Sequence, residues 1–119
     1  MKKILVVEDH DSARFLYQEE LTEAGYDVLA AADGQEALDL LQKQKIDLLI
    51  TDIKMPHISG AALINQLHST DPKLPVIVVS AFKQYAEPLA PNIKSFFLKP
   101  INFTVFKQVV ADLLGEEQK

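Results

Sequence analysis

The chain has 119 residues, of which 48% are hydrophobic and 24% are charged, a balance typical of one globular domain. Its 12 basic and 17 acidic residues give a net charge of −5, which argues against a nucleic-acid-coating protein, because phosphate contacts require a basic surface. The absence of cysteine excludes disulfides, iron–sulfur clusters and thiolate zinc sites. The first apolar run, Ile4–Val7, is too short for a signal peptide or for a membrane span of ~20 residues. We therefore expect a cytoplasmic protein with a single domain over residues 1–119.

Apolar runs of strand length alternate with stretches of helical periodicity in the first part of the chain. A strand is expected at Ile4–Val7. The helix after it should begin with a cap at Asp11 or Ser12 and end before Gly25. A second strand is expected at Val28–Ala31.

The same alternation continues through the middle of the chain. A second helix follows Asp33-Gly34 and leads to a strand at Leu48–Thr51. A third helix, whose apolar positions run from Leu63 to Leu67, precedes a strand at Val76–Val79.

The last part of the chain contains the least regular segment. Ala81–Lys94 holds two prolines that remove amide donors, so we expect one short helical turn at Gln84–Glu87 and then a loop. A weaker strand at Phe96–Leu98 and a helix from a cap at Asn102 to Gly115 should complete the domain.

Continuous apolar strands, rather than alternating ones, are typical of a parallel sheet that is covered on both faces. Five such strands alternating with helices predict a doubly wound α/β fold with a five-stranded parallel sheet and helices on both faces. In these folds ligands bind at the carboxyl ends of the strands, where the strand order reverses.

Polar side chains stand at four of those strand ends. Glu8 and Asp9 follow the first strand, Asp52 the third, Ser80 the fourth and Lys99 the fifth. Clustered carboxylates stay ionised only beside a cation, and oxygen ligands favour Mg²⁺ before Mn²⁺ or Ca²⁺. A carboxylate beside Mg²⁺ can attack a phosphoryl group, and Lys99 is then a second cation for a phosphoryl oxygen.

Each of these residues also has an ordinary interpretation. An isolated acidic pair most often ends a strand in solvent, a strand-end serine bonds local backbone, and a lone lysine is a surface residue. The three acids together with Ser80 and Lys99 favour a site, in which Ser80 bonds an oxygen of a phosphoryl group on Asp52. We expect His10 to point away from the acids, because the turn should direct it elsewhere and Mg²⁺ prefers oxygen.

Four motifs, in order and each at a strand end, make the chain similar to the receiver domains of two-component response regulators over its whole length. They are Val6-Val7-Glu8-Asp9, Thr51-Asp52-Ile53-Lys54-Met55-Pro56 with Gly60 beyond it, Val79-Ser80-Ala81, and Leu98-Lys99-Pro100. The resemblance implies the flavodoxin-like strand order 2-1-3-4-5. The stretch between Ser80 and Lys99 is a few residues shorter than is usual in receivers, so the helix expected there should be short or irregular.

The resemblance also implies how the acids act. Asp52 would accept a phosphoryl group from the phosphohistidine of a sensor histidine kinase or of a histidine phosphotransfer protein. The Mg²⁺ ligands would be Glu8, Asp9, Asp52 and the backbone carbonyl of Lys54. The domain would catalyse only its own phosphorylation and dephosphorylation and would turn over no metabolite.

The remaining implied roles concern the switch and its readout. Lys99 would bind the acyl phosphate, and Ser80 and Phe96 would move on activation. The bond between Lys99 and Pro100 would be cis. A downstream protein would read the altered surface of a monomer or weak dimer, without direct contact with nucleic acid or membrane. The start at Met1 favours a free-standing or N-terminal receiver over a domain cut from a larger regulator.

Three other interpretations stay open at this point. A phosphatase of the haloacid-dehalogenase type also uses a strand-end aspartate with Mg²⁺, but it normally has a second aspartate where this chain has Lys54. A flavodoxin shares the fold, but the acidic segment from Glu8 to Asp11 would repel the cofactor phosphate. A pseudo-receiver that only binds partners would not need the complete set of acids, serine and lysine.

Overall fold

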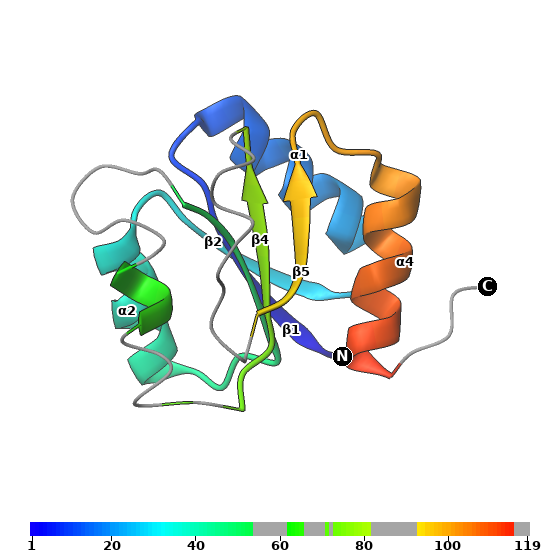
Figure 1. Ribbon diagram of the computed structural model, residues 1–119. Coiled ribbons are helices and arrows are strands. Elements are labelled where there is room, and N and C mark those ends of the chain that lie inside the picture. The colour runs from blue at the N-terminus through cyan, green and yellow to red at the C-terminus, as the bar shows by residue number, and fades with distance from the viewer. Residues whose placement is uncertain (54–61, 66–70, 72, 82–92, 116–119) are drawn as a thin grey trace.

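The computed structural model describes residues 1–53, 62–65, 71, 73–81 and 93–115. These residues contain five strands, and Figure 1 shows them at the centre of the molecule. The strands are β1 (Lys3–Val7), β2 (Asp27–Ala31), β3 (Leu48–Asp52), β4 (Val76–Ser80) and β5 (Ile93–Leu98). The helices are α1 (Asp11–Glu23), α2 (Gly34–Lys43) and α4 (Phe103–Leu114), and residues 62–65 are also helical.

The strands form one parallel sheet in the order β2-β1-β3-β4-β5, which confirms the predicted fold. The chain order reverses between β1 and β3, which is the switch point at which such sheets bind ligands. Val7 pairs with Thr51, and the next residue of β3, Asp52, pairs with Val79 of β4. Ser80 pairs with Leu98, so the residues that follow β1, β3 and β5 emerge at the same edge.

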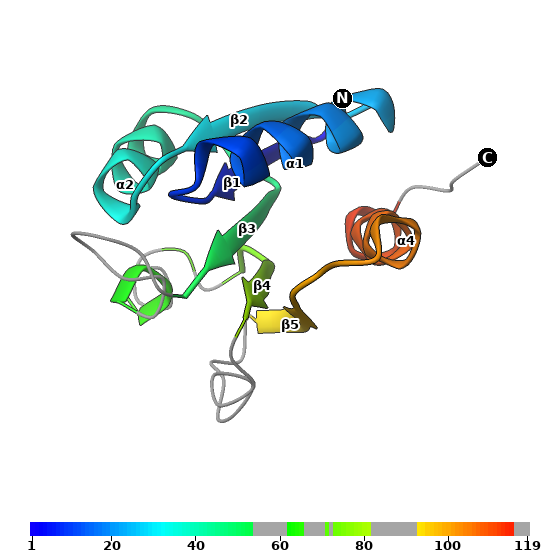
Figure 2. The ribbon, with the colours of Figure 1, turned by 90° about the horizontal axis from the view of Figure 1, so that it is seen from above.

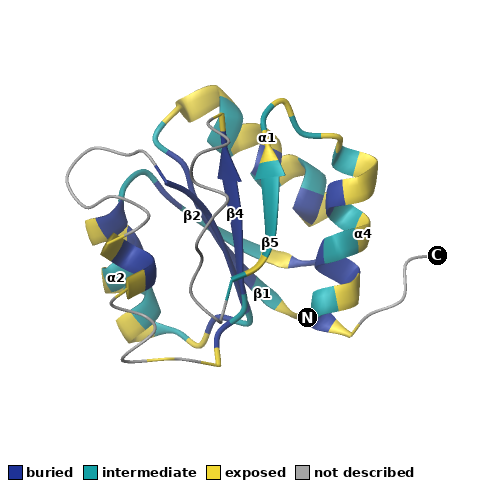
Figure 3. Cartoon of the chain, in the orientation of Figure 1, coloured by how far each residue is buried: buried dark blue, intermediate teal, exposed yellow. Residues whose placement is uncertain are grey.

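Two apolar clusters cover the two faces of the sheet, because successive side chains of a strand point to opposite sides. Leu5 and Val7 pack toward α2 and residues 62–65, whereas Ile4 and Val6 pack toward α1 and α4. Figure 2 shows the helices separated in this way on either side of the sheet. Every residue of β3 and β4 is buried, as the continuous apolar runs predicted (Figure 3).

Side-chain caps explain where two of the helices begin. The carboxylate of Asp33 accepts a hydrogen bond from the backbone N–H of Glu36 at 2.9 Å, and this caps α2. The side chain of Asn102 accepts from the N–H groups of Thr104 and Val105 at 3.0 and 3.2 Å, as predicted for α4. That helix ends at Gly115, whose φ of +71° places it in the left-handed region.

The start of α1 and the extent of β5 differ from the predictions. His10, not Asp11 or Ser12, is the N-cap of α1, and its side chain makes no capping hydrogen bond. The carboxylate of Asp11 instead pairs with the guanidinium of Arg14, one turn further along. Strand β5 begins at Ile93 rather than at Phe96, because pairing with β4 supplies backbone hydrogen bonds to a segment whose sequence pattern is weak.

Two expectations fall outside the described part of the chain. The short turn at Gln84–Glu87, and with it the form of the segment between β4 and β5, lies in residues 82–92. The third helix is described only at residues 62–65, where Leu63 and Ile64 are buried as expected. Within the described residues, no helix combines the length and apolar character needed to cross a membrane.

Phe106 of α4 offers a test of how the core is held together. Its ring is fully buried and meets Phe97 edge-to-face at 5.2 Å, with Tyr17 and Phe103 both at 5.9 Å. Phe106→Ala should lower the free energy of unfolding by about 3–5 kcal/mol, measured by urea denaturation, because it leaves a cavity among these rings. Val105, the neighbouring residue, is 52% exposed, and Val105→Ala should change stability by no more than about 0.5 kcal/mol. Equal losses in the two variants would contradict this description of the core.

Candidate functional site

One lysine connects two carboxylates at the carboxyl edge of the sheet. The ammonium Nζ of Lys99 donates hydrogen bonds to Asp52 Oδ2 at 2.6 Å and to Glu8 Oε1 at 2.7 Å. The side chain of Glu8 is fully buried, and that of Asp52 is only 10% exposed. Two nearly buried carboxylates this close to one another need a cation between them, and the Lys99 ammonium supplies it.

The same contacts keep Lys99 charged. Burial alone would lower the pKa of its ammonium, but the hydrogen bonds to Asp52 and Glu8 outweigh burial and raise the pKa above its ordinary value. The Lys99 side chain therefore stays protonated at neutral pH, with its positive charge next to the Asp52 carboxylate.

The backbone positions this lysine from the neighbouring strand. The N–H of Lys99 donates to the carbonyl oxygen of Ser80 at 2.8 Å, directly beyond the register pair of Ser80 and Leu98. Ser80 itself is fully buried. The hydroxyl of Thr51 donates to the carbonyl of Asp52 at 2.9 Å, which adds a local contact at the end of β3. The predicted residues Glu8, Asp52, Ser80 and Lys99 therefore do come together.

Phe96 and the proline after Lys99 lie where the sequence placed them. Phe96 pairs with Val78 in the sheet, is half-buried, and packs against the apolar cluster on the α2 side. The peptide bond between Lys99 and Pro100 is cis, as the family resemblance implied.

The expectation for His10 is wrong. Its Nδ1 atom lies 3.3 Å from both Glu8 Oε2 and Asp9 Oδ1. The reason is local: the backbone N–H of His10 donates to Glu8 Oε2 at 3.1 Å, and this hydrogen bond draws the first residues of the helix toward the acids. The ring lies at the rim of the site with a side chain that is 75% exposed.

The predicted metal ligands are only partly assembled. The ligand atoms that all lie within 4.8 Å of one another come from Glu8, Asp9 and His10, and this group does not include Asp52, whose Oδ2 is bonded to Lys99. Lys54 lies outside the described residues. Asp9 Oδ1 is buried and has no hydrogen-bond partner, although buried polar atoms normally have one. An oxygen in this state fits a cation ligand, so the carboxylates present are compatible with Mg²⁺.

Sequence reasoning missed Arg14 as a residue that shapes the site. Its guanidinium donates to the backbone carbonyl of Glu8 at 2.9 Å and also pairs with Asp11. The loop between β1 and α1 is thereby tied to the first turn of the helix. A basic residue one turn after an acidic loop was the available signal.

Tyr17 is a second residue near the site that the sequence did not single out. It is buried between the site and the rings of Phe103 and Phe106. Burial raises the pKa of its phenol to about 12, Lys99 opposes this rise, and the carboxylates of Glu8 and Asp52 add to it. The phenol therefore senses the charges of the site.

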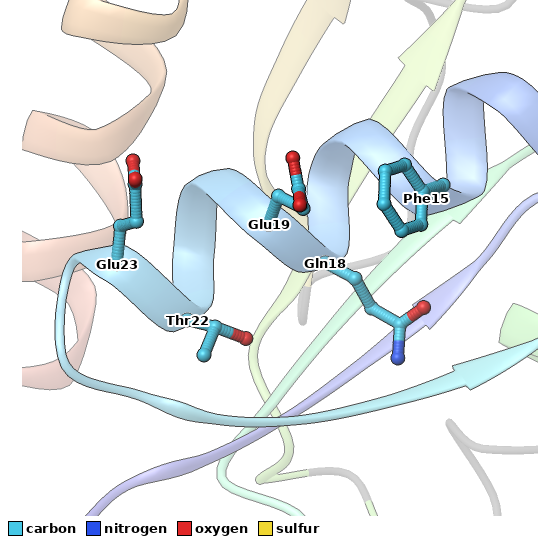
Figure 4. Close-up of a pocket in the computed structure, with 5 residues that line it drawn as sticks. All are labelled: Phe15, Gln18, Glu19, Thr22 and Glu23. Carbon is cyan, nitrogen blue, oxygen red and sulfur yellow. The ribbon is translucent and has the colours of Figure 1, made fainter.

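Among the residues that the structure describes, α1 lines two pockets. One, of about 270 Å³, is formed by α1 and residues 99–103 and includes the Lys99 side chain. The other, of about 320 Å³, is lined by side chains that all come from α1, as Figure 4 shows: Phe15, Gln18, Glu19, Thr22 and Glu23. The second pocket shares no residue with the acidic site.

The strand order and the charged side chains at the carboxyl edge are those of a parallel α/β protein whose functional residues lie at the ends of the strands. The chain belongs to the response regulator receiver domain family, whose model matches residues 4–111. The curated relatives include the alkaline phosphatase synthesis transcriptional regulatory protein PhoP of Bacillus subtilis. That protein is 39% identical over 80 residues, which are 67% of this chain and 33% of PhoP.

Other relatives differ in how much of their length is matched. Protein CcdB of Bacillus subtilis is 34% identical over 119 residues, which cover 97% of this chain and 99% of CcdB. The chain spans only 26% of the transcriptional regulatory protein GlrR of Escherichia coli, at 31% identity over 116 residues. The matched region is therefore only a part of PhoP and of GlrR, and the activities of those two regulators belong to the longer proteins.

Solved structures show the same fold. The response regulator TrrA of Thermotoga maritima, in complex with Mg²⁺ and BeF, has a TM-score of 0.89 at 36% identity, covering 96% of this chain and 100% of that one. A structure of the histidine kinase ThkA in complex with TrrA has a TM-score of 0.86 at 35% identity, covering 96% of this chain and 99% of the matched chain.

Replacing Lys99 tests whether its ammonium offsets the buried acids. Lys99→Met should lower the free energy of unfolding by about 2–4 kcal/mol at neutral pH, because Glu8 is left as a buried charge without its cation. Lys107 is the matched control. Its side chain is also about a quarter exposed and pairs at 2.6 Å with Glu20, which is 27% exposed. Lys107→Met should cost about 1 kcal/mol or less. Denaturant unfolding of both variants measures the two losses in the free energy of unfolding. Equal losses would show that Glu8 needs no cationic partner.

Tyr17 predicts a loss of stability at alkaline pH. Between pH 10 and pH 12 the unfolded chain loses the phenol proton while the native state keeps it, so the free energy of unfolding falls as the pH rises. Tyr17→Phe removes this contribution, and across that window the variant should lose about 2–3 kcal/mol less than the parent. Urea titrations at a series of pH values measure the two slopes. Parallel curves would show that the Tyr17 pKa is not raised by folding.

Proposed function

We propose that the chain is a phosphorylation-activated switch of a two-component or phosphorelay system, in which Asp52 accepts the phosphoryl group. The observation that carries the proposal is the 2.6 Å contact between Asp52 Oδ2 and the Lys99 ammonium at the switch point of the sheet. A carboxylate at the rim of the sheet, with a fixed cation beside it, is suited to receive an anionic group.

The donor would be the phosphohistidine of a sensor histidine kinase or of a histidine phosphotransfer protein. An Asp52 carboxylate oxygen attacks the phosphorus atom as the phosphorus–nitrogen bond breaks. The bonding electron pair stays on the imidazole nitrogen of the donor, which takes up a proton. The product is an acyl phosphate on Asp52, and the Lys99 ammonium offsets its additional negative charge.

Glu8, Asp9 and Asp52, with the backbone carbonyl of Lys54, would hold Mg²⁺. The ion, when bound, offsets the charge of the phosphoryl oxygens and of the clustered carboxylates. The Oδ1 atom of Asp9, which is buried and accepts no hydrogen bond, supports this assignment, as does the Mg²⁺ in the complex of the related TrrA.

The switch would pass through Ser80 and Phe96. Ser80 is fully buried beside the backbone of Lys99, so a change in the contacts of Lys99 is transmitted directly to the end of β4. Phe96 is half-buried on β5 and packs against the apolar cluster on the α2 side, so a change in its packing would alter that face of the sheet. The negative charge added to Asp52 would in this way shift the equilibrium between two conformations of one surface.

A protein partner is supported by two observations. TrrA forms a complex with the histidine kinase ThkA. Helix α1 begins directly after the acidic residues and leaves Phe15 60% and Leu16 45% exposed, which is apolar area next to the site. The phosphorylated surface, on a monomer or weak dimer in the cytoplasm, would then be read by a downstream protein. The net charge of −5 favours a protein over nucleic acid or an anionic membrane as the direct partner.

Intact mass spectrometry after incubation with a small-molecule phosphodonor and Mg²⁺ tests the proposal. The parent should gain a single phosphoryl group, and the gain should be lost in Asp52→Asn and in the presence of a chelator. Asp39 is exposed on α2, and Asp39→Asn should be phosphorylated like the parent.

A negative result with the small donor calls for a transfer assay from phosphorylated histidine kinases. Transfer to the parent but not to Asp52→Asn would support a switch selective for protein donors. No transfer, with Mg²⁺ bound and the protein folded, would favour the pseudo-receiver interpretation instead. Turnover of a free phosphate ester would favour a phosphatase.

A further inference from the structure

The pocket between α1 and residues 99–103 has the composition of a small-molecule site. Its volume is about 270 Å³, and five of its lining side chains are apolar: Ala13, Leu16, Pro100, Ile101 and Phe103. The two polar side chains in its wall are those of Tyr17 and Lys99. Pockets that bind small molecules are mostly apolar and contain a few polar groups that orient the ligand. We call this cavity the Tyr17 pocket.

The volume of the Tyr17 pocket limits the ligand to a compact molecule. An apolar cavity of about 150 Å³ can hold benzene, so about 270 Å³ leaves room for one aromatic ring and a short substituent. Contacts between aromatic rings hold one wall in place. The ring centroid of Tyr17 lies 5.7 Å from that of Phe103 and 5.9 Å from that of Phe106, and Tyr17 is only 4% exposed. The pocket therefore needs little rearrangement to accept a ring.

Both polar side chains of the Tyr17 pocket can donate hydrogen bonds to a ligand. Burial raises the pKa of Tyr17 to about 12, so the phenol keeps its proton at neutral pH. The Lys99 ammonium has three N–H donors, and it gives one to Glu8 and one to Asp52. Within the described residues, these contacts leave one N–H for a ligand. The polar end of the ligand should therefore be an acceptor, such as a carbonyl oxygen.

The charge beside the Tyr17 pocket argues against an anionic ligand. Lys99 is shared by the carboxylates of Glu8 and Asp52, so one positive charge faces two negative charges. Both carboxylates are nearly buried, where solvent and salt screen charges only weakly, so a further anion would be repelled. A neutral acceptor avoids this repulsion.

We propose that the Tyr17 pocket binds a neutral carbonyl compound with a single aromatic ring. The ring lies among the apolar side chains, and the carbonyl oxygen accepts hydrogen bonds from the Tyr17 hydroxyl and from the Lys99 ammonium. This binding requires neither Mg²⁺ nor a phosphoryl group. It therefore goes beyond the proposed function and does not rest on it.

Titration of the full chain with acetophenone, followed by NMR of the backbone amides without Mg²⁺ or a phosphodonor, tests the proposal. Acetophenone should shift the amide signals of Ala13, Leu16, Tyr17 and Ile101, with a dissociation constant on the order of 1 mM for a ligand of this size. Benzoate has the same number of non-hydrogen atoms but carries a negative charge, and it should bind about tenfold more weakly. An absence of shifts with acetophenone, or equal binding of benzoate, would overturn the proposal.

Two variants separate the cavity from its donors. Tyr17→Phe keeps the ring but removes the hydroxyl, and it should weaken acetophenone binding about threefold or more. Tyr26→Phe is the matched control, because Tyr26 is also buried but does not line the pocket, and it should bind like the parent. Ala13→Leu fills the cavity and should abolish the shifts. Binding that is unchanged in Tyr17→Phe and in Ala13→Leu would place acetophenone elsewhere and refute the site.

Dilution of the protein without acetophenone distinguishes a small ligand from a second copy of the chain. The amide signals of residues that line the Tyr17 pocket should not depend on protein concentration. If they do, a second copy occupies the pocket and the proposal is wrong. Since these experiments contain no phosphodonor, a failure of the phosphorylation assay would not alter their outcome.

Discussion

The contact on which this structure depends is the Lys99 ammonium between the carboxylates of Glu8 and Asp52. Bringing two acids to a nearly dry sheet edge is unfavourable unless a cation compensates for their lost hydration. The cation can lie there only because β1, β3 and β5 end at the same edge, and because β4 holds the backbone of Lys99 through Ser80. The ion-pair network and the strand order therefore stabilise one another.

The proposed switch would use this same arrangement. Lys99 divides its hydrogen bonds between Glu8 and Asp52, so a new anionic group on Asp52 would compete with Glu8 for the same ammonium. The backbone bond from Lys99 to Ser80 joins that competition to the end of β4, and Tyr17 is coupled to the same charges from α1. A local change in charge at Asp52 would thus reach three elements through direct contacts.

The loop after β1 holds Glu8 through two further contacts. Arg14 binds the carbonyl of Glu8, and the N–H of His10 binds the carboxylate of Glu8, so the acidic residue is held from both sides. One consequence is that an imidazole stands beside Asp9, where the side chain was expected to turn away. The hydrogen bond from the backbone N–H of His10 to the Glu8 carboxylate fixes the direction of His10. An N–H group at a helix start needs an acceptor, whereas the exposed ring has no strong preference for another direction.

The amino-acid sequence by itself determined the fold class, since buried parallel strands need continuous apolar runs such as those of β3 and β4, and since Asn102 and Gly115 specify the ends of α4. It also determined which residue types stand at the strand ends. Only the tertiary structure decided which of them touch. The contact of Lys99 with Glu8, 91 positions away, depends on strand register, and the direction of His10 depends on a hydrogen bond to Glu8. Neither the early start of β5 nor the role of Arg14 follows from local sequence preference. Strand β5 begins at Ile93 because it pairs there with β4, and Arg14 acts through its hydrogen bond to the backbone carbonyl of Glu8.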